Sequence, residues 1–170
     1  GCMGTLYTLD GWGLVCLSGV MKKLFILSFF ITGFSSLQAW GADFEKGLAA
    51  VRSGDYATAL KEWTPLAEQG NVNAQVRLGI MYDNGFGVIQ DYKTAVKWYK
   101  LAAEQGNASA QWNLGIMYNH GLAVIRDPVY AHMWANIARS NGSENASKLL
   151  DMLVKKMTPA QIEKAQDLAR

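Results

Sequence analysis

The feature that most constrains this chain is an internal repeat with a period of 36 residues. Residues 70–106 read GNVNAQVRLGIMYDNGFGVIQDYKTAVKWYKLAAEQG, and residues 106–142 read GNASAQWNLGIMYNHGLAVIRDPVYAHMWANIARSNG. The run Leu-Gly-Ile-Met-Tyr stands at the same place in both copies. Self-similarity at such a period is the signature of a solenoid, in which each unit buries its apolar face against its neighbours.

Each copy is expected to form two helices. In the first copy, apolar residues recur at the three- and four-residue spacing of one helical face over 73–84 and again over 91–105. Asp91 and its counterpart Asp127 precede the second helices and are interpreted as helix caps. Gly79 falls inside the first helix, at a cost of about 1 kcal/mol relative to alanine. Its recurrence as Gly115 indicates that a neighbouring helix approaches closely there.

The residues around the two copies continue the helical pattern. Residues 43–53 and 55–69 predict one helix pair, and Ser143 and Thr158 are expected to cap two further helices that end the chain. No stretch has the pattern of a strand. The predicted fold class is all-α: a solenoid of antiparallel helix pairs with C-terminal capping helices. Its domain spans 43–170, with a partial unit at 43–70, repeats at 71–106 and 107–142, and a cap at 143–170.

The N-terminal part reads as a targeting segment. Residues 21–39 combine a basic start, a short apolar run and a small-residue end, as a bacterial secretory signal peptide does. Cleavage is expected after Ala39, with Ala42 as a weaker site; an uncleaved membrane anchor is the alternative. Residues 1–20 are interpreted as an upstream extension outside the fold, and both cysteines, Cys2 and Cys16, lie there.

Composition argues against several classes of function. The net charge of +2 and the lack of a long basic run argue against nucleic-acid binding. His120 and His132 are not at a metal-ligand spacing, and no cysteine joins them, so neither a metal site nor a cofactor is predicted. No catalytic residue is assigned. The recurring aromatic positions are expected to be core: Tyr82, Trp98, Tyr118 and Trp134.

These motifs carry a family resemblance. The pattern A-Q-x-x-L-G-x-M-Y-x-x-G-x-G-V-x-x-D-Y-x-x-A-x-x-W-Y-x-x-A-A-x-Q-G at 74–106 resembles the Sel1-like repeat, a relative of the tetratricopeptide repeat. The copy at 110–142 matches less fully, since Ala123 replaces a turn glycine and Pro128 replaces the tyrosine. The resemblance implies a right-handed superhelix with a concave face, used as an adaptor or scaffold that holds other proteins.

The same resemblance supplies an enzymatic alternative. Some cysteine-rich secreted members of the family are described as binding or slowly hydrolysing penicillins. This chain has no cysteine in its repeats, and no Ser-x-x-Lys motif follows the signal segment. The expectation is therefore a non-enzyme, with weak penicillin binding or β-lactamase-like activity as the alternative.

The candidate binding residues are those that differ between the copies on the first helix of each pair. By resemblance to tetratricopeptide solenoids, that helix lines the concave groove. The predicted groove residues are Asn73, Arg77, Asn84, Trp112, Asn113 and His120. Trp112 stands where the first copy has Val76, and two roles are open for it: anchoring a partner, or packing against the C-terminal helices.

The sequence thus predicts an exported protein, periplasmic or secreted, that holds a peptide or an envelope protein in its groove. Membrane contact is expected only through an uncleaved signal segment. A third possibility is a structural element that docks in a larger complex without a groove ligand.

Overall fold

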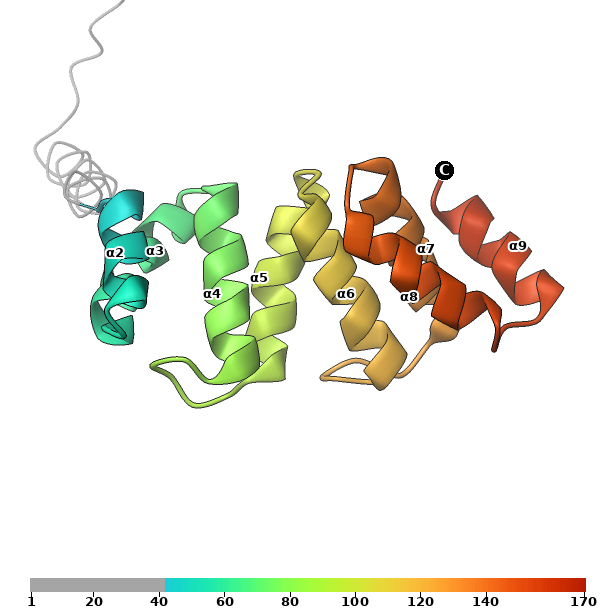
Figure 1. Cartoon of the computed structure of the whole chain (residues 1–170), viewed down its shortest axis with the longest axis horizontal. Helices are drawn as coiled ribbons and strands as arrows, with labels where there is room; N and C mark the ends of the chain where they lie inside the picture. The colour runs from blue at the N-terminus through green and yellow to red at the C-terminus, as the bar shows by residue number, and fades with distance from the viewer. Residues whose placement is uncertain (1–41) are drawn as a thin grey trace, which may run out of the picture. The chain divides into compact units, whose positions relative to one another are not determined.

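A computed structural model describes residues 42–170, so the predicted signal segment and the stretch before it lie outside the described residues. The described part is all helical, as predicted, and the helices follow one another in chain order along one row (Figure 1). None of these helices is long and apolar enough to cross a membrane. The helices are α2 (Phe44–Arg52), α3 (Tyr56–Glu68), α4 (Val72–Asn84), α5 (Tyr92–Glu104), α6 (Ala108–His120), α7 (Pro128–Ser140), α8 (Glu144–Val154) and α9 (Pro159–Leu168).

Aspartates begin the second helix of each repeat. The Asp91 carboxylate accepts a hydrogen bond from the Lys93 amide at 2.9 Å, and the Asp127 carboxylate accepts one from the Val129 amide at 2.8 Å. Both bonds occupy amides that have no partner within the helix. The capping role predicted for the two aspartates is confirmed.

The first helices begin one residue earlier than predicted, at Val72 and Ala108. Asn71 and Asn107 are the N-caps of α4 and α6. The side-chain oxygen of each accepts a hydrogen bond from the backbone amide three residues later in the chain. At the C-terminal end, Thr158 and Gln161 form the predicted capping box. The prediction for Ser143 is wrong in one respect, because its side chain caps no amide of α8.

Apolar residues gather in three clusters, and each cluster draws on successive helices. The first joins α2, α3 and α4, the second joins α4, α5 and α6, and the third joins α7, α8 and α9, with α6 side chains packed against it. Every helix pair therefore buries its apolar face against its neighbours, as a solenoid requires. The largest fully buried side chains in these clusters are Trp63, Leu78, Tyr99, Leu114, Met117 and Leu153.

Glycines inside the first helices receive the side chains of their neighbours. A Cβ atom placed on Gly79 would lie 2.5 Å from Cε1 of Tyr99, so the ring of α5 occupies the space that a side chain would need. At Gly115 the nearest atom comes from Leu149 of α8, at 3.1 Å. The predicted close approach is confirmed at Gly79 and is looser at Gly115.

The recurring aromatic residues are less buried than predicted. All four pack against a core cluster, but each keeps part of its surface exposed: Tyr82, Trp98, Tyr118 and Trp134. The fully buried aromatics are instead Trp63 and Tyr99, which stand one period apart on α3 and α5. The α7 residue at the same position is Ala135, and this smaller side chain accompanies the entry of Leu149 above Gly115.

A buried glutamine in each first helix bridges three helices. Gln75 of α4 donates to the Ala67 carbonyl of α3 at 3.1 Å, and its own amide oxygen accepts from Gln105, just after α5, at 2.9 Å. The second copy repeats the bridge one period later. Gln111 donates to the Ala103 carbonyl at 3.0 Å, and its amide oxygen accepts from Asn141 at 2.8 Å. Each bridge ties one helix pair to the pair before it.

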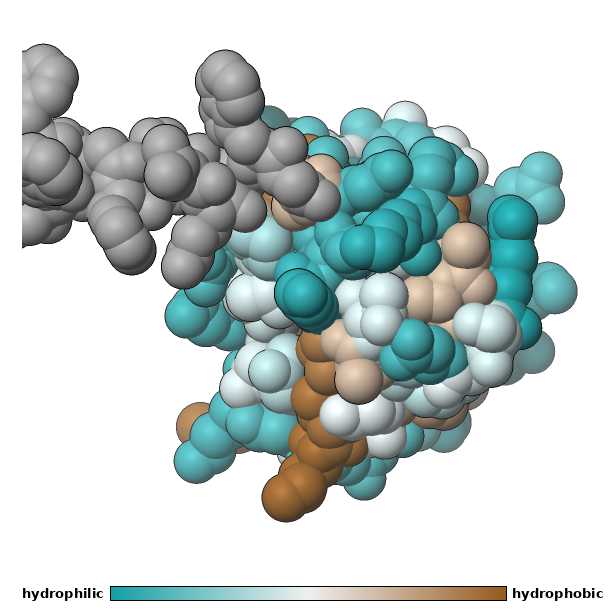
Figure 2. All heavy atoms as spheres, turned by 90° about the vertical axis from the view of Figure 1, so that its left-hand side faces the viewer, coloured by the Kyte–Doolittle hydropathy of each residue, from teal (hydrophilic) through white to brown (hydrophobic). Residues whose placement is uncertain are grey.

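At the α2 end, a buried carboxylate holds α2 on α3. Glu62 is 3% exposed and accepts hydrogen bonds from the Lys46 ammonium and the Asp43 amide. The hydrogen bond from Lys46 is the main reason that the pKa of Glu62 lies below its usual value. The face at this end is mainly hydrophilic, with one narrow hydrophobic strip (Figure 2).

The turn between the two helices of a repeat requires a left-handed residue. Gly87 has a φ of 71° in the first copy, and Ala123, which stands at the same position in the second, has a φ of 55°. An L-residue with a side chain is disfavoured in this region by about 1–2 kcal/mol. The substitution of alanine for glycine at 123 therefore leaves strain in the second turn.

We expect Gly79→Ala to destabilise the protein, although alanine favours helices by about 1 kcal/mol. The added methyl group would press on the Tyr99 ring, and overpacking of this kind typically costs about 1–3 kcal/mol. Denaturant unfolding measures the change. In a Tyr99→Leu background the ring is absent, and the same substitution should cost less; an equal cost in both backgrounds would contradict the packing argument.

Relief of the turn strain should be measurable as well. Ala123→Gly is expected to raise the free energy of unfolding by about 1 kcal/mol, because glycine adopts the left-handed region without penalty. The matched control is Gly87→Ala, which should lower stability, since its new methyl group would also meet Cβ of Tyr56. Loss of stability in Ala123→Gly would show that the second turn is not strained.

Candidate functional site

The first helices of three successive pairs surround one hollow. It has a volume of about 350 Å³ and lies between α2, α4 and the start of α6. Two of the predicted groove residues, Asn73 and Arg77, line it together with Ser109, the counterpart of Asn73 in the second copy. The remaining lining residues are Phe44, Val76, Ile80 and Asn107.

The hollow combines an apolar floor with polar groups at its rim. Val76 is buried and Ile80 half-buried, while Asn73 and Arg77 are exposed. Arg77 is the only charged side chain among the described residues that line it. Such a surface can hold an extended segment through hydrogen bonds to its backbone, with Arg77 attracting a negative group.

The other predicted groove residues lie elsewhere. Asn84 donates to the Ile80 carbonyl at 2.9 Å, and Asn113 donates to the Ser109 carbonyl at 3.0 Å. His120 is exposed at the last residue of α6. None of the three lines the hollow, so the structure brings together Asn73 and Arg77 but not the rest of the predicted set.

Trp112 is half-buried on α6. It packs against the cluster to which α8 contributes Leu149, Leu150 and Leu153. Its counterpart Val76 lines the hollow instead. The contact of Trp112 with this cluster is the packing role that the sequence left open beside partner binding.

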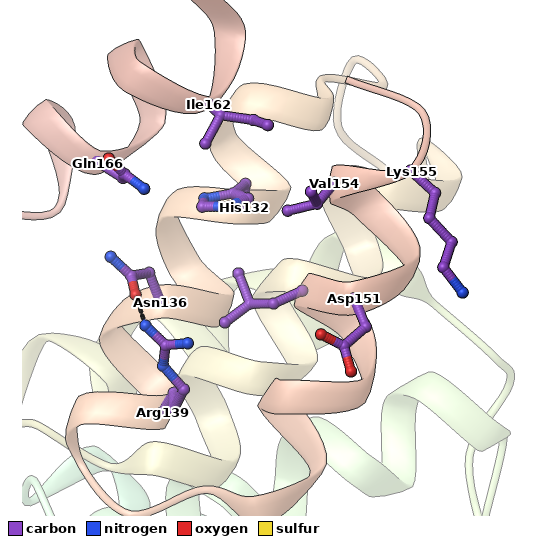
Figure 3. Close-up of a pocket in the computed structure, with 9 residues that line it drawn as sticks. His132, Asn136, Arg139, Asp151, Val154, Lys155, Ile162 and Gln166 are labelled. Atoms are coloured by element: carbon purple, nitrogen blue, oxygen red, sulfur yellow. Dashed lines mark hydrogen bonds between the residues drawn. The ribbon is translucent and has the colours of Figure 1, made fainter. Parts of the chain in front are cut away.

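A second hollow lies between α7, α8 and α9, and sequence reasoning missed it. Both α8 and α9 pack on α7 but scarcely touch each other, which leaves about 640 Å³ between them. Figure 3 shows side chains from all three helices around this space. The lining residues are His132, Asn136, Arg139, Leu150, Asp151, Val154, Lys155, Ile162 and Gln166.

His132 is the unusual residue of this second hollow. Its side chain is on the buried side of α7, with the residue 4% exposed, and its Nδ1 atom has no hydrogen-bond partner. Burial and, to a lesser degree, the positive charge of Arg139 lower the pKa of His132 below its ordinary value of 6.5. The imidazole is therefore neutral near pH 7. The sequence holds one sign of this buried histidine: its counterpart in the first copy is the core residue Val96.

Within residues 42–170, no group of three or more histidine, cysteine, aspartate and glutamate side chains is placed to hold a metal ion.

Comparisons with known proteins agree with this architecture. The family model for the Sel1 repeat matches residues 72–107 and 108–143. A crystal structure of a protective antigen of uropathogenic Escherichia coli, displaying an SLR fold, superposes with a TM-score of 0.70 at 31% identity; the match covers 79% of this chain and 29% of that one. A Sel1 repeat protein from Oxalobacter formigenes gives a TM-score of 0.64 at 28% identity, covering 75% and 54%. The search of curated proteins gave no match.

The buried histidine predicts a pH dependence of stability. The unfolded chain takes up a proton on His132 near pH 6.5, whereas the folded chain resists it, so stability should fall as the pH falls below 6.5. The loss is at most about 1.4 kcal/mol per pH unit. Denaturant unfolding at pH values from about 7.5 to about 5.5 measures it, in a range above the titration of ordinary carboxylates.

The variant His132→Val should lose this decline, and His120→Gln, at an exposed position, should keep it. If the loss of stability at low pH is unchanged in His132→Val, groups other than His132 cause it. Asp151 and Lys155 of α8 are the other charged groups that line this hollow besides Arg139.

Proposed function

Since the chain is a Sel1 repeat protein by sequence and by fold, we propose that it binds an extended segment of another protein in the hollow between α2, α4 and α6. Sel1 repeats typically mediate protein–protein interaction. The observation that carries the proposal is that three successive first helices contribute to one hollow, with Asn73 and Arg77 exposed at its rim.

The lining of the hollow indicates what kind of segment would fit. Asn73 and Ser109 offer hydrogen-bonding side chains one period apart, which suits the repeating polar groups of an extended backbone. Arg77 favours a carboxylate on the partner, because charge-assisted bonds to guanidinium are stronger than neutral ones. The partner segment in this proposal is therefore extended and carries an acidic residue opposite Arg77.

The role proposed is that of an adaptor without catalytic activity. The two superposed structures are a protective antigen and a Sel1 repeat protein, and this chain spans 29% and 54% of their lengths. Export to the periplasm or the medium is also part of the proposal. Its support is the sequence pattern at 21–39, which lies outside the described residues.

Site-specific photo-crosslinking tests the groove. A photoreactive amino acid placed at position 73 and, separately, at position 109 should yield adducts with the same cellular protein, because both positions line one hollow. In a chain that also carries Arg77→Ala, the adduct at position 73 should fall by about tenfold, the effect of losing one charge-assisted hydrogen bond.

The matched controls use Arg52, an exposed arginine at the end of α2 that does not line the hollow. A photoreactive residue at position 52 should not capture the same protein, and Arg52→Ala should leave the adduct at position 73 unchanged. If positions 73 and 109 capture unrelated proteins, or if Arg77→Ala leaves capture intact, the hollow does not bind the partner.

A further inference from the structure

The hollow between α8 and α9 contains a residue that the scaffold does not need. His132 occupies the position at which the first copy has the core residue Val96, and the same side of the helix is buried in both copies. A buried polar atom without a hydrogen-bond partner destabilises the folded state, because it has lost its bonds to water. Valine would fill this position without that cost, so the histidine calls for a role other than packing.

The space beside His132 has the dimensions of a ligand site. Its volume of about 640 Å³ falls within the range of small-molecule pockets, which is roughly 300–1,000 Å³. It exists because α9 packs on α7 and leaves a gap to α8, whereas the two helices of each complete repeat pack tightly on each other. The site is separate from the hollow between α2, α4 and α6.

Donor groups gather on the α7 and α9 side of this space. In Figure 3, the side chains of Asn136, Arg139 and Gln166 lie on one side of the hollow, and Arg139 is the farthest of the three from the His132 ring. Arg139 donates to the Asn136 amide oxygen at 2.8 Å, which leaves the amide nitrogen of Asn136 facing the space. The Lys155 ammonium points away from His132. The charge that remains on this side is the positive guanidinium.

The α8 side of the hollow is mixed: Leu150 and Val154 are apolar, whereas Asp151 and Lys155 line it with charged groups. Ile162 of α9 adds a third apolar side chain. Leu150 is buried, Ile162 is half-buried, and Val154 is 45% exposed. Covering the exposed Val154 side chain with the apolar part of a ligand would remove apolar surface from water, which favours binding. Arg139 and Asn136 suit a negative, hydrogen-bonding end of a ligand, and Leu150, Val154 and Ile162 suit a hydrocarbon body.

We propose that this hollow binds an aliphatic carboxylate. The carboxylate accepts hydrogen bonds from Arg139 and Asn136, and the hydrocarbon part covers Val154 and Ile162. His132 lines the middle of the site and contacts the ligand between the two ends. A free fatty acid and the C-terminal residue of a polypeptide share this chemistry, so the experiment below includes both sources.

Calorimetric and NMR titrations of the full chain test the proposal. The probes are octanoate, the tripeptide acetyl-Gly-Ala-Leu with a free carboxylate, and the same tripeptide as its C-terminal amide. We expect at least one of the two acids to bind, with shifts of the backbone amides of His132 and Gln166, and the amide to bind at least about tenfold more weakly. Binding of octanoate alone identifies a free acid as the source, and binding of the tripeptide acid alone identifies a polypeptide C-terminus.

Two variants separate the site from a general affinity for anions. Arg139→Ala and His132→Val should each weaken the binding by about tenfold or more. Arg52→Ala removes an exposed arginine far from the hollow and should leave it unchanged. The proposal is overturned if neither acid binds, if the amide binds as well as the acid, or if Arg139→Ala has no effect. Because Arg77 is not involved, these outcomes are independent of the test of the partner-binding hollow.

Discussion

The structure depends on the burial of one glutamine in each repeat. Gln75 and Gln111 are almost fully buried. A buried side-chain amide without hydrogen-bond partners would lower the stability of the fold by about 1–3 kcal/mol. Each therefore needs a carbonyl from the preceding helix and an amide donor from the residue that ends the following helix. This requirement fixes the relative placement of three helices at a time. Repeated once per period, it sets how one pair stacks on the next.

The close packing follows from that placement. The aromatic ring of Tyr99 lies over Gly79, and Trp63 lies in the same way over Gly47. In the second repeat Ala135 replaces the ring, and Leu149 of α8 enters the vacated space. The C-terminal helices thus dock by filling a place that the repeat itself leaves open. They do not continue its geometry, because α9 packs on α7 and a gap remains beside α8.

The sequence predicted the parts of the molecule that repeat. Helices, aspartate caps and the close approach at Gly79 all followed from periodicity and local chemistry. It could not predict which polar residues share a hollow, because that depends on how helices from different pairs are stacked. Asn73 and Arg77 of α4 line one hollow with Ser109 of α6, whereas the Asn113 side chain donates a hydrogen bond to the Ser109 carbonyl of its own helix. Residue spacing alone argues only against a metal site at His132, whereas the comparison of the two copies shows that it replaces the core residue Val96.

Residues shared by the two copies build the scaffold, whereas His132, a polar departure from the repeat inside the core, serves binding. The most direct test is the free energy of unfolding of ligand-free His132→Val at neutral pH, measured with denaturant. Restoring the valine of the first copy should raise the free energy of unfolding by about 1 kcal/mol, because a buried nitrogen without a hydrogen-bond partner is removed. A decrease would show that the histidine holds the fold together and would contradict the division between scaffold and site.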